Sequence, residues 1–138
     1  MIVLDTNVLS ELMRAKPDGA VFAWVQGQTV ATLYTTTITQ AEILHGLLLL
    51  PAGKRREAIR EAAEEMFAHD FGDRILPFDS AAALAYADIA SQRRKSGRPI
   101  SQFDAQIAAI VRSRGSDLAT RNTSDFDGCG IKLLNPWG

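Results

Sequence analysis

Short apolar runs alternate along the chain with longer stretches in which apolar residues recur every three or four positions. The short runs predict buried strands at residues 2–4, 35–38, 74–78, 117–120 and 131–134. The longer stretches predict helices from 8 up to Pro17 and over 19–26, 39–50, 53–69, 79–94 and 103–114, with one helical turn at 124–126. This alternation is typical of a parallel sheet with helices on both faces. The predicted fold class is therefore α/β, a three-layer α/β/α sandwich around a central parallel sheet.

The length of 138 residues corresponds to one domain of ordinary size, so residues 1–138 are predicted to form a single domain. Hydrophobic residues at 46% and charged residues at 22% are typical of a globular protein and argue against a disordered chain. The single cysteine, Cys129, excludes an internal disulfide and a cysteine-rich zinc site. The first residues lack the features of a signal peptide, and no apolar run is long enough to span a membrane. A cytoplasmic location without membrane contact is expected.

Charge is nearly balanced, with 15 Lys and Arg against 16 Asp and Glu and a formal net charge of −1. No overall positive field is therefore available to hold nucleic acid, and any such contact must come from a local patch or from recruited metal ions. One basic cluster, 93–95 with Arg98, is interpreted either as a solvated helix end or as a phosphate contact, with the former favoured. The glycine-rich motifs of nucleotide-binding loops and the G-x-S-x-G motif of hydrolases are absent.

Three carboxylates lie at positions that bring them to one edge of the predicted sheet. Asp5 follows the first strand, Glu42 lies in the predicted first turn of the helix after the second strand, and Asp104 lies in the first turn of the helix that leads into the fourth. Ligand sites of open parallel sheets lie at the carboxyl ends of the strands. Carboxylates gathered there raise one another's pKa unless a cation lies among them. Oxygen ligands without paired His or Cys favour a hard cation, Mg²⁺ or Mn²⁺.

Each of these carboxylates also has a purely structural interpretation. Thr39-x-x-Glu42 has the form of a capping box, Ser101-x-x-Asp104 nearly does, and Asp5 or Asn7 could cap the first helix. Taken singly, a helix cap is the more common role for such a residue. The joint placement of three carboxylates at one edge favours the functional interpretation.

Five short segments occur in one order along nearly the whole chain. They are Val3-Leu4-Asp5-Thr6-Asn7-Val8-Leu9-Ser10, Thr39-Gln40-Ala41-Glu42-Ile43, Phe103-Asp104-Ala105-Gln106-Ile107-Ala108, Thr120-Arg121-Asn122 with Asp125-Phe126, and Asn135-Pro136-Trp137. Together they resemble the PIN domains, and most closely the VapC/FitB toxins of bacterial type II toxin–antitoxin systems. Each segment alone is a weak signal, but the first four in register are specific.

The resemblance implies a parallel α/β/α fold and a metal-dependent endoribonuclease that hydrolyses RNA phosphodiester bonds. The family's first three acidic positions fall on Asp5, Glu42 and Asp104, and the fourth, often Asp, falls on Asn122 here. A neutral amide binds a cation less strongly, which leaves open whether one or two metal ions bind and whether Asp125 replaces the missing acid. The implied cofactor is Mg²⁺, with Mn²⁺ as the alternative.

Our hypothesis for the mechanism assigns a role to each of these positions. Asp5 and Asp104 bind Mg²⁺ directly, while Glu42 and Asn122 hold water in the site and orient the attacking molecule. Thr120 matches a hydroxyl position at the end of the family's fourth strand. The products implied by the resemblance carry a 5′-phosphate and a 3′-hydroxyl.

The resemblance also implies partners. A homodimer is expected, together with a small VapB/FitA-like antitoxin that binds operator DNA and inserts a segment with a basic side chain over the active site. The chain shows no DNA-binding motif of its own, so operator binding is assigned to the partner. The RNA target, the antitoxin's identity and the physiological role are not specified by the sequence.

Two other classes of protein stay open. One is a catalytically silent PIN-like interaction module, in which the acids only cap helices, and Asn122 is the feature that keeps it open. The other is a receiver-like phospho-acceptor domain, which is also α/β with clustered acids. It is disfavoured because Asp5 lacks the second acid that a receiver places beside it.

Overall fold

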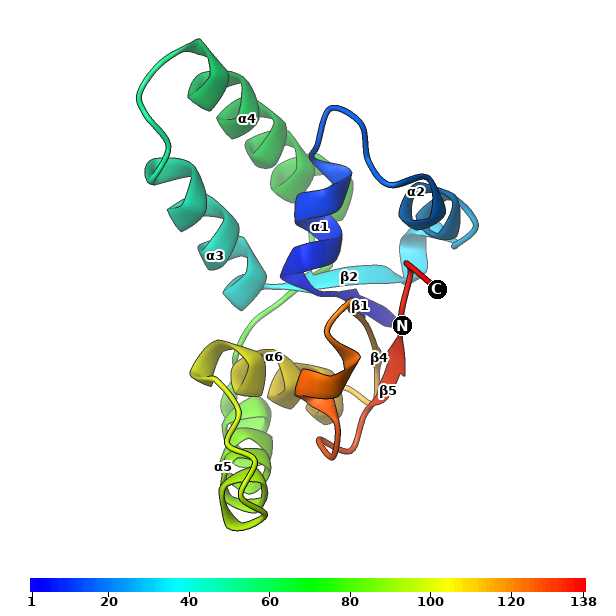
Figure 1. Cartoon of the computed structure of the whole chain (residues 1–138), viewed down its shortest axis with the longest axis vertical. Helices are drawn as coiled ribbons and strands as arrows, with labels where there is room; N and C mark the ends of the chain where they lie inside the picture. Colours follow the sequence, from blue (N-terminus) through cyan, green and yellow to red (C-terminus); the bar gives the residue numbers. More distant parts are fainter.

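The computed structural model of the chain describes all residues from Met1 to Gly138 (Figure 1). Its strands are β1 (Ile2–Leu4), β2 (Leu33–Thr36), β3 (Ile75–Leu76), β4 (Asp117–Ala119) and β5 (Lys132–Leu134). Its α-helices are α1 (Thr6–Leu12), α2 (Gly19–Gln26), α3 (Thr37–Leu48), α4 (Lys54–Glu65), α5 (Ser80–Lys95) and α6 (Gln102–Ser113). Two 3-10 helices, η1 (Val30–Thr32) and η3 (Thr123–Phe126), and a π-helix, η2 (Met66–Phe71), complete the list.

The five strands form one parallel sheet in the order β3-β2-β1-β4-β5. The first strand of the chain is the central one, since Ile2 lies opposite both Leu33 of β2 and Asp117 of β4. The carboxyl ends of parallel strands meet at one edge of the sheet. The residue that follows β1 therefore lies in the middle of that edge. The predicted α/β class with a parallel sheet is confirmed.

Helices cover both faces of the sheet and form the predicted three layers. In Figure 1, α5 and α6 lie on one side of the sheet, and α1, α3 and α4 lie on the other. Side chains alternate along each strand, so Val3 and Leu118 join one buried cluster while Leu4 and Ala119 join the other. One sheet thus supports two cores.

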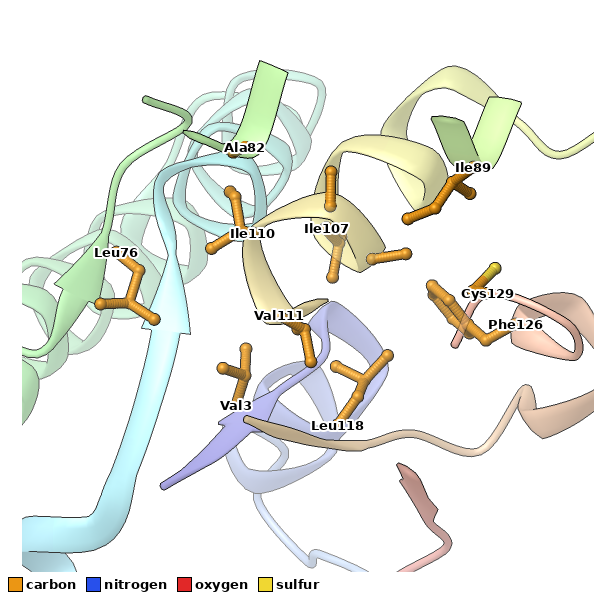
Figure 2. Close-up of a cluster of buried hydrophobic side chains, with 12 residues drawn as sticks. Val3, Leu76, Ala82, Ile89, Ile107, Ile110, Val111, Leu118, Phe126 and Cys129 are labelled. Atoms are coloured by element: carbon orange, nitrogen blue, oxygen red, sulfur yellow. The ribbon is translucent and has the colours of Figure 1, made fainter. Parts of the chain in front are cut away.

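The core under α5 and α6 is built mainly on α6. Val3 and Leu118 of the sheet share a cluster with Ile107, Ile110 and Val111, all of them buried (Figure 2). Each such side chain stabilises the fold by about 1.5–3 kcal/mol through its removal from water. These contacts fix α6 against the two central strands, and α6 carries Asp104 in its first turn.

The opposite core joins the other helices to the same strands. Leu4 lies in a cluster with Leu9 of α1, Ile43 of α3, Ala63 of α4 and Phe67 of η2. Burial of these side chains fixes α1 and α3 on the sheet. Both helices begin at the carboxyl edge, directly after β1 and β2.

The second strand begins earlier than the sequence pattern predicts. The prediction of a strand at 35–38 is wrong by two residues, because β2 spans Leu33–Thr36 and α3 already begins at Thr37. The Thr36 hydroxyl accepts a hydrogen bond from the backbone N–H of Thr39 at 3.1 Å and so caps the helix. Strand propensity favoured the whole β-branched run, and this local cap overrides it.

The first helix begins two residues earlier and ends five residues earlier than predicted, since α1 stops at Leu12 rather than continuing up to Pro17. The other predicted elements are confirmed within about two residues. The helix predicted over 53–69 is α4 continued by the π-helix η2, and the turn predicted at 124–126 lies within η3. The short helix η1 has no counterpart in the prediction. No helix combines the length and the apolar character needed to cross a bilayer.

Candidate active site

Asp5 lies in the middle of the carboxyl edge, directly after the central strand. Its Oδ1 accepts a hydrogen bond from the backbone N–H of Thr6 at 2.8 Å, and its Oδ2 accepts one from the Thr120 hydroxyl, also at 2.8 Å. The residue is only 4% exposed. Asp5 is also the N-cap of α1, so its structural interpretation holds alongside the functional one. Both carboxylate oxygens are thus fixed in position.

Thr120 joins three parts of this edge through one hydroxyl group. Besides donating to Asp5, its Oγ1 accepts hydrogen bonds from Asn7 Nδ2 at 3.3 Å and from the backbone N–H of Asn122 at 3.1 Å. Thr120 is fully buried and directly follows β4. Its predicted place at the end of the fourth strand is confirmed.

Glu42 reaches the site from the second turn of α3, so its predicted place in the first turn is wrong. The Thr6 hydroxyl donates to Glu42 Oε1 at 3.1 Å and lies 3.0 Å from the Thr39 hydroxyl. The capping-box interpretation of Thr39 and Glu42 is also wrong, because Thr36 caps this helix. The three side chains instead form a hydrogen-bonded link between α1 and α3.

Asp104 lies in the first turn of α6, as predicted. The Ser101 hydroxyl accepts a hydrogen bond from the backbone N–H of Asp104 at 3.2 Å and caps the helix. The Asp104 side chain is half-buried and lines the same cavity as Asp5 and Glu42. The convergence of the three predicted carboxylates at one edge is therefore confirmed as geometry.

The shared cavity has a volume of about 540 Å³. Its lining residues are Asp5, Thr6, Asn7, Ser10, Glu11, Arg14, Glu42, Asp104, Arg121, Asn122 and Trp137. Asn122 lines the cavity, whereas Asp125 does not. Asp125 is exposed, and its charge acts on Asp104 from outside the cavity. The amide, rather than the acid three residues later, lies beside the carboxylates.

Burial makes ionisation of the Asp5 carboxyl group unfavourable. The pKa of Asp5 is raised from 3.8 to about 6, chiefly because burial removes the carboxylate from water. Hydrogen bonds from Thr120 and Thr6 stabilise the charged form and act in the opposite direction, while the charges of Asp104 and Glu42 raise the pKa further. The site therefore favours a bound proton or a bound cation at Asp5.

The other two carboxylates show weaker versions of the same effect. Burial raises the pKa of Glu42, a hydrogen bond from Thr6 opposes this, and the charge of Asp104 adds to it. Burial also raises the pKa of Asp104, a hydrogen bond with Ser101 opposes this, and the charge of Asp125 adds to it. Each carboxylate near the cavity thus makes its neighbour harder to ionise.

The donor atoms at the cavity are oxygen atoms from three carboxylates, an amide and hydroxyl groups. No three Asp, Glu, His or Cys side chains lie close enough together to enclose a metal ion by themselves. A closed structural metal site is therefore excluded. The set fits a hard ion that contacts one or two carboxylates and keeps several water molecules, which is how Mg²⁺ is usually bound.

A family model described as PIN domain matches residues 2–128. The chain belongs to the PIN domain family. Two curated relatives match this PIN domain over nearly their full length. The VapC ribonuclease Y4jK of Sinorhizobium fredii is 46% identical over 99% of this chain and 98% of its own. The toxin FitB of Neisseria gonorrhoeae is 38% identical over 99% of each chain.

Solved structures give the same result for the three-dimensional fold. A chain of the FitAB complex bound to a DNA fragment superimposes with a TM-score of 0.94 at 38% identity, covering 100% of this PIN domain and 96% of that chain. The FitAcB complex of Neisseria gonorrhoeae gives a TM-score of 0.93 over 99% of each chain. The expected likeness to the VapC/FitB toxins is confirmed.

The cavity of this PIN domain contains three residues that the sequence analysis does not place there, Ser10, Glu11 and Arg14. With Asn7 they lie one above the other on the side of α1 and the turn after it. Their spacing is that of one helix face, so this polar stripe beside Asp5 was a usable signal. The stripe forms one wall of the cavity.

The basic cluster before α6 has exposed and buried members. Arg94 and Lys95 are exposed in the last turn of α5, as the interpretation of a solvated helix end predicts, whereas Arg93 is buried. Its guanidinium donates to the backbone oxygens of Arg98, Asp125 and Asp127 at 2.7, 2.8 and 3.0 Å. Arg93 therefore ties the end of α5 to the loop before α6 and to the end of η3. The phosphate-contact alternative does not fit Arg93 either, because the side chain is buried and its Nε and Nη1 groups donate inside the protein.

Proposed function

We propose that this PIN domain is a Mg²⁺-dependent endoribonuclease and the toxin of a type II toxin–antitoxin system. The observation that carries the proposal is the convergence of Asp5, Glu42 and Asp104 in one cavity at the carboxyl edge of a PIN-domain sheet. The names of its relatives, VapC ribonuclease and toxin FitB, support the same activity.

In this proposal, Asp5 and Asp104 hold the ion, with Mn²⁺ as an alternative to Mg²⁺. When bound, the ion neutralises the carboxylates and polarises the scissile phosphate. Each Asp5 oxygen accepts one hydrogen bond from the protein and keeps a second lone pair for a ligand. Asn122 offers an amide oxygen that holds water at the cavity wall.

Glu42 is placed to orient the attacking water. Its Oε1 accepts a hydrogen bond from Thr6, and its other oxygen stays available to water. The raised pKa of Glu42 makes it a better proton acceptor than an exposed glutamate. Attack of the water oxygen on phosphorus breaks the bond to the 3′-oxygen. One proton given up by the water ends on that oxygen. The ends formed are a 5′-phosphate and a 3′-hydroxyl.

The test uses the purified protein, free of antitoxin, with a mixed pool of RNA. We expect cleavage with Mg²⁺ or Mn²⁺, none with EDTA, and a loss of at least about 10²-fold in Asp5→Asn, since the site loses a charge that holds the ion. The matched control is Asp79→Asn. Asp79 also follows a strand and caps a helix, but it lies outside the cavity. Cleavage by Asp5→Asn at the wild-type rate would show that the site is assigned wrongly.

We further propose a cytoplasmic location, a homodimer and a VapB/FitA-like antitoxin that binds operator DNA. The DNA-bound FitAB complex supports this assignment of DNA binding to the assembly. Co-expression from the native operon followed by size-exclusion chromatography with light scattering tests it. A single complex that contains both proteins is expected, and a toxin that elutes only as a free monomer would contradict it.

A catalytically silent interaction module is the second candidate. Two observations favour it. Asn122 stands in place of the family's frequent fourth acid, and the carboxylates of the cavity do not come close enough for three of them to hold one metal ion together. Calorimetric titration with Mg²⁺ and Mn²⁺ distinguishes the two candidates. A folded, antitoxin-free protein that binds neither ion and cuts no RNA would favour the silent module.

A further inference from the structure

The proposed function poses an electrostatic problem at the cavity. Four of its lining residues carry carboxylates, namely Asp5, Glu11, Glu42 and Asp104. RNA is a polyanion and is repelled by such a wall, even when a divalent ion offsets part of the charge. A substrate of this kind needs a positive group at the cavity to hold it near the carboxylates. Only two of the lining residues, Arg14 and Arg121, can supply one.

The two arginines differ in what they contact. Arg14 Nη1 lies 3.3 Å from Glu11 Oε2, so its charge is offset within the protein. Arg121 forms no salt bridge and donates no side-chain hydrogen bond inside the chain, and it is exposed. Its five N–H groups are therefore available to an anion from outside.

Trp137 holds the Arg121 side chain at the cavity. The guanidinium carbon lies over the indole ring, 5.1 Å from its centroid, which is a favourable cation–π distance. Trp137 itself packs against the core cluster under α1 and α3, and its backbone N–H donates to Asn135 Oδ1 at 2.9 Å. The ring is thus a fixed support rather than a loose side chain.

The backbone of Arg121 is tied to the same network that orients Asp5. Arg121 lies between Thr120, which donates to Asp5, and Asn122, which lines the cavity. Its backbone N–H donates to Asn7 Oδ1 at 3.4 Å. Arg121 is therefore the next residue in the chain after Thr120, whose hydroxyl orients the buried carboxylate of Asp5.

We propose that Arg121, supported by Trp137, is the RNA-binding residue of this site and contacts a backbone phosphate next to the one that is cut. This inference rests on the proposed nuclease function and adds the group that holds the substrate. A planar guanidinium binds phosphate oxygens through two parallel hydrogen bonds, which suits a contact independent of base sequence. Arg121 lowers KM and leaves the chemical step to the carboxylates.

The test compares Arg121→Ala, Arg121→Lys and Trp137→Leu with wild type, using a short single-stranded RNA. Arg121→Ala is expected to raise KM about 10-fold, the size of one charge-assisted contact, with kcat changed less than about 3-fold. The slope of log affinity against log salt should become shallower by about 0.7, the value for one phosphate contact on a single strand. Arg121→Lys keeps the charge and should restore the slope, but only part of the affinity, because it cannot bind through two bonds.

Two further variants complete the design. Trp137→Leu keeps an apolar side chain but removes the ring face, so a smaller rise in KM is expected with the salt slope unchanged. Arg55→Ala removes an exposed arginine of α4 that does not line the cavity, and it should match wild type in every measurement. Circular dichroism melts of each variant separate a binding defect from unfolding.

The outcomes distinguish this inference from the proposed function. If Arg121→Ala keeps the wild-type KM and the wild-type salt slope, the inference is overturned while the nuclease activity stands. A variant that loses only kcat and keeps its KM would overturn the inference in the same way. If wild type cuts no RNA, fluorescence anisotropy with the same RNA still measures the contact. Binding by wild type that is lost in Arg121→Ala would then support the contact and reject the nuclease. Equal binding by both proteins would reject the contact.

Discussion

The two sides of the acidic cavity are built in different ways. On one side, Asp5 follows the central strand and receives hydrogen bonds at both oxygens from Thr6 and Thr120. On the other side, Asp104 is half-buried at a helix start, held by Ser101 and by the loop that Arg93 fixes. The first side is fixed by the sheet itself, and the second by one cap and one buried side chain.

This difference separates two tasks that a hydrolytic site must combine. A deeply buried carboxylate has a fixed direction but is costly to ionise, so it needs a cation. A half-exposed carboxylate ionises more easily and has more room to meet an incoming phosphate. The predictions below weaken one side at a time, beginning with the largest expected effect.

Asp5 should make the metal-free protein less stable as pH rises. Its pKa is raised from 3.8 to about 6, so between these values the folded state holds a proton that the unfolded state has lost. The free energy of unfolding should therefore fall by about 3 kcal/mol as pH rises from about 4 to about 6 and then level off, since one pKa unit is about 1.4 kcal/mol. Urea unfolding in EDTA at a series of pH values measures this fall.

Asp5→Asn should remove most of this pH dependence, because the amide does not titrate. Asp104→Asn is the matched comparison on the other side of the cavity and should remove less of it. An unchanged slope in Asp5→Asn would show that Asp5 is not the group responsible.

Arg93→Lys should weaken the Asp104 side selectively. A lysine has one ammonium group in place of the fork that reaches three backbone oxygens, so at least one of these partly buried carbonyls loses its partner. A loss of about 2–3 kcal/mol in the free energy of unfolding is expected. The matched control, Arg94→Lys, changes an exposed neighbour in the same helix turn and should have no effect. Thermal and urea unfolding provide the measurement.

Thr120→Val should act on the Asp5 side with a smaller effect. The substitution keeps the shape and removes the hydroxyl that donates to Asp5 Oδ2, so the pKa of Asp5 rises further. When the cleavage rate is plotted against pH, the rise on the acid side should move to higher pH. Thr37→Val is the control, since the Thr37 side chain makes no hydrogen bond to another residue. A profile that stays at the wild-type position would count against the assigned hydrogen bond.

Ser101→Ala should have the smallest effect. It removes the cap of α6 and a hydrogen bond that lowers the pKa of Asp104. A loss of about 1 kcal/mol in unfolding free energy is expected, with cleavage at neutral pH reduced only slightly. Ser101→Asp, which keeps a capping oxygen, should restore the stability, and failure to do so would show that the cap is not the cause.

Much of the site was predictable because its carboxylates stand next to recognisable element ends. Asp5 follows an apolar run, and Asp104 lies three residues after a serine of capping type, so local patterns place both. The sequence pattern places Glu42 at the right edge but in the wrong turn, because β-branched propensity extends the predicted strand across the start of α3. Short-range signals were therefore accurate to about one helical turn.

The missed parts depend on contacts between distant segments. The buried guanidinium of Arg93 donates to backbone oxygens of Asp125 and Asp127, which lie more than thirty residues away along the chain. No local sequence pattern carries that information. The support of Arg121 by Trp137 has the same origin. The single domain over 1–138 stays a prediction, which one cooperative urea transition would support.

The central position of β1 has a consequence for the timing of synthesis. Asp5 is translated early, but Thr120, which orients it, follows 115 residues later. At about 5–20 residues per second, the ribosome takes on the order of 10 s to add them. Until then the sheet lacks β4, and the carboxylate lacks its hydroxyl donor. A nuclease built in this way has no complete site until its own translation is nearly finished.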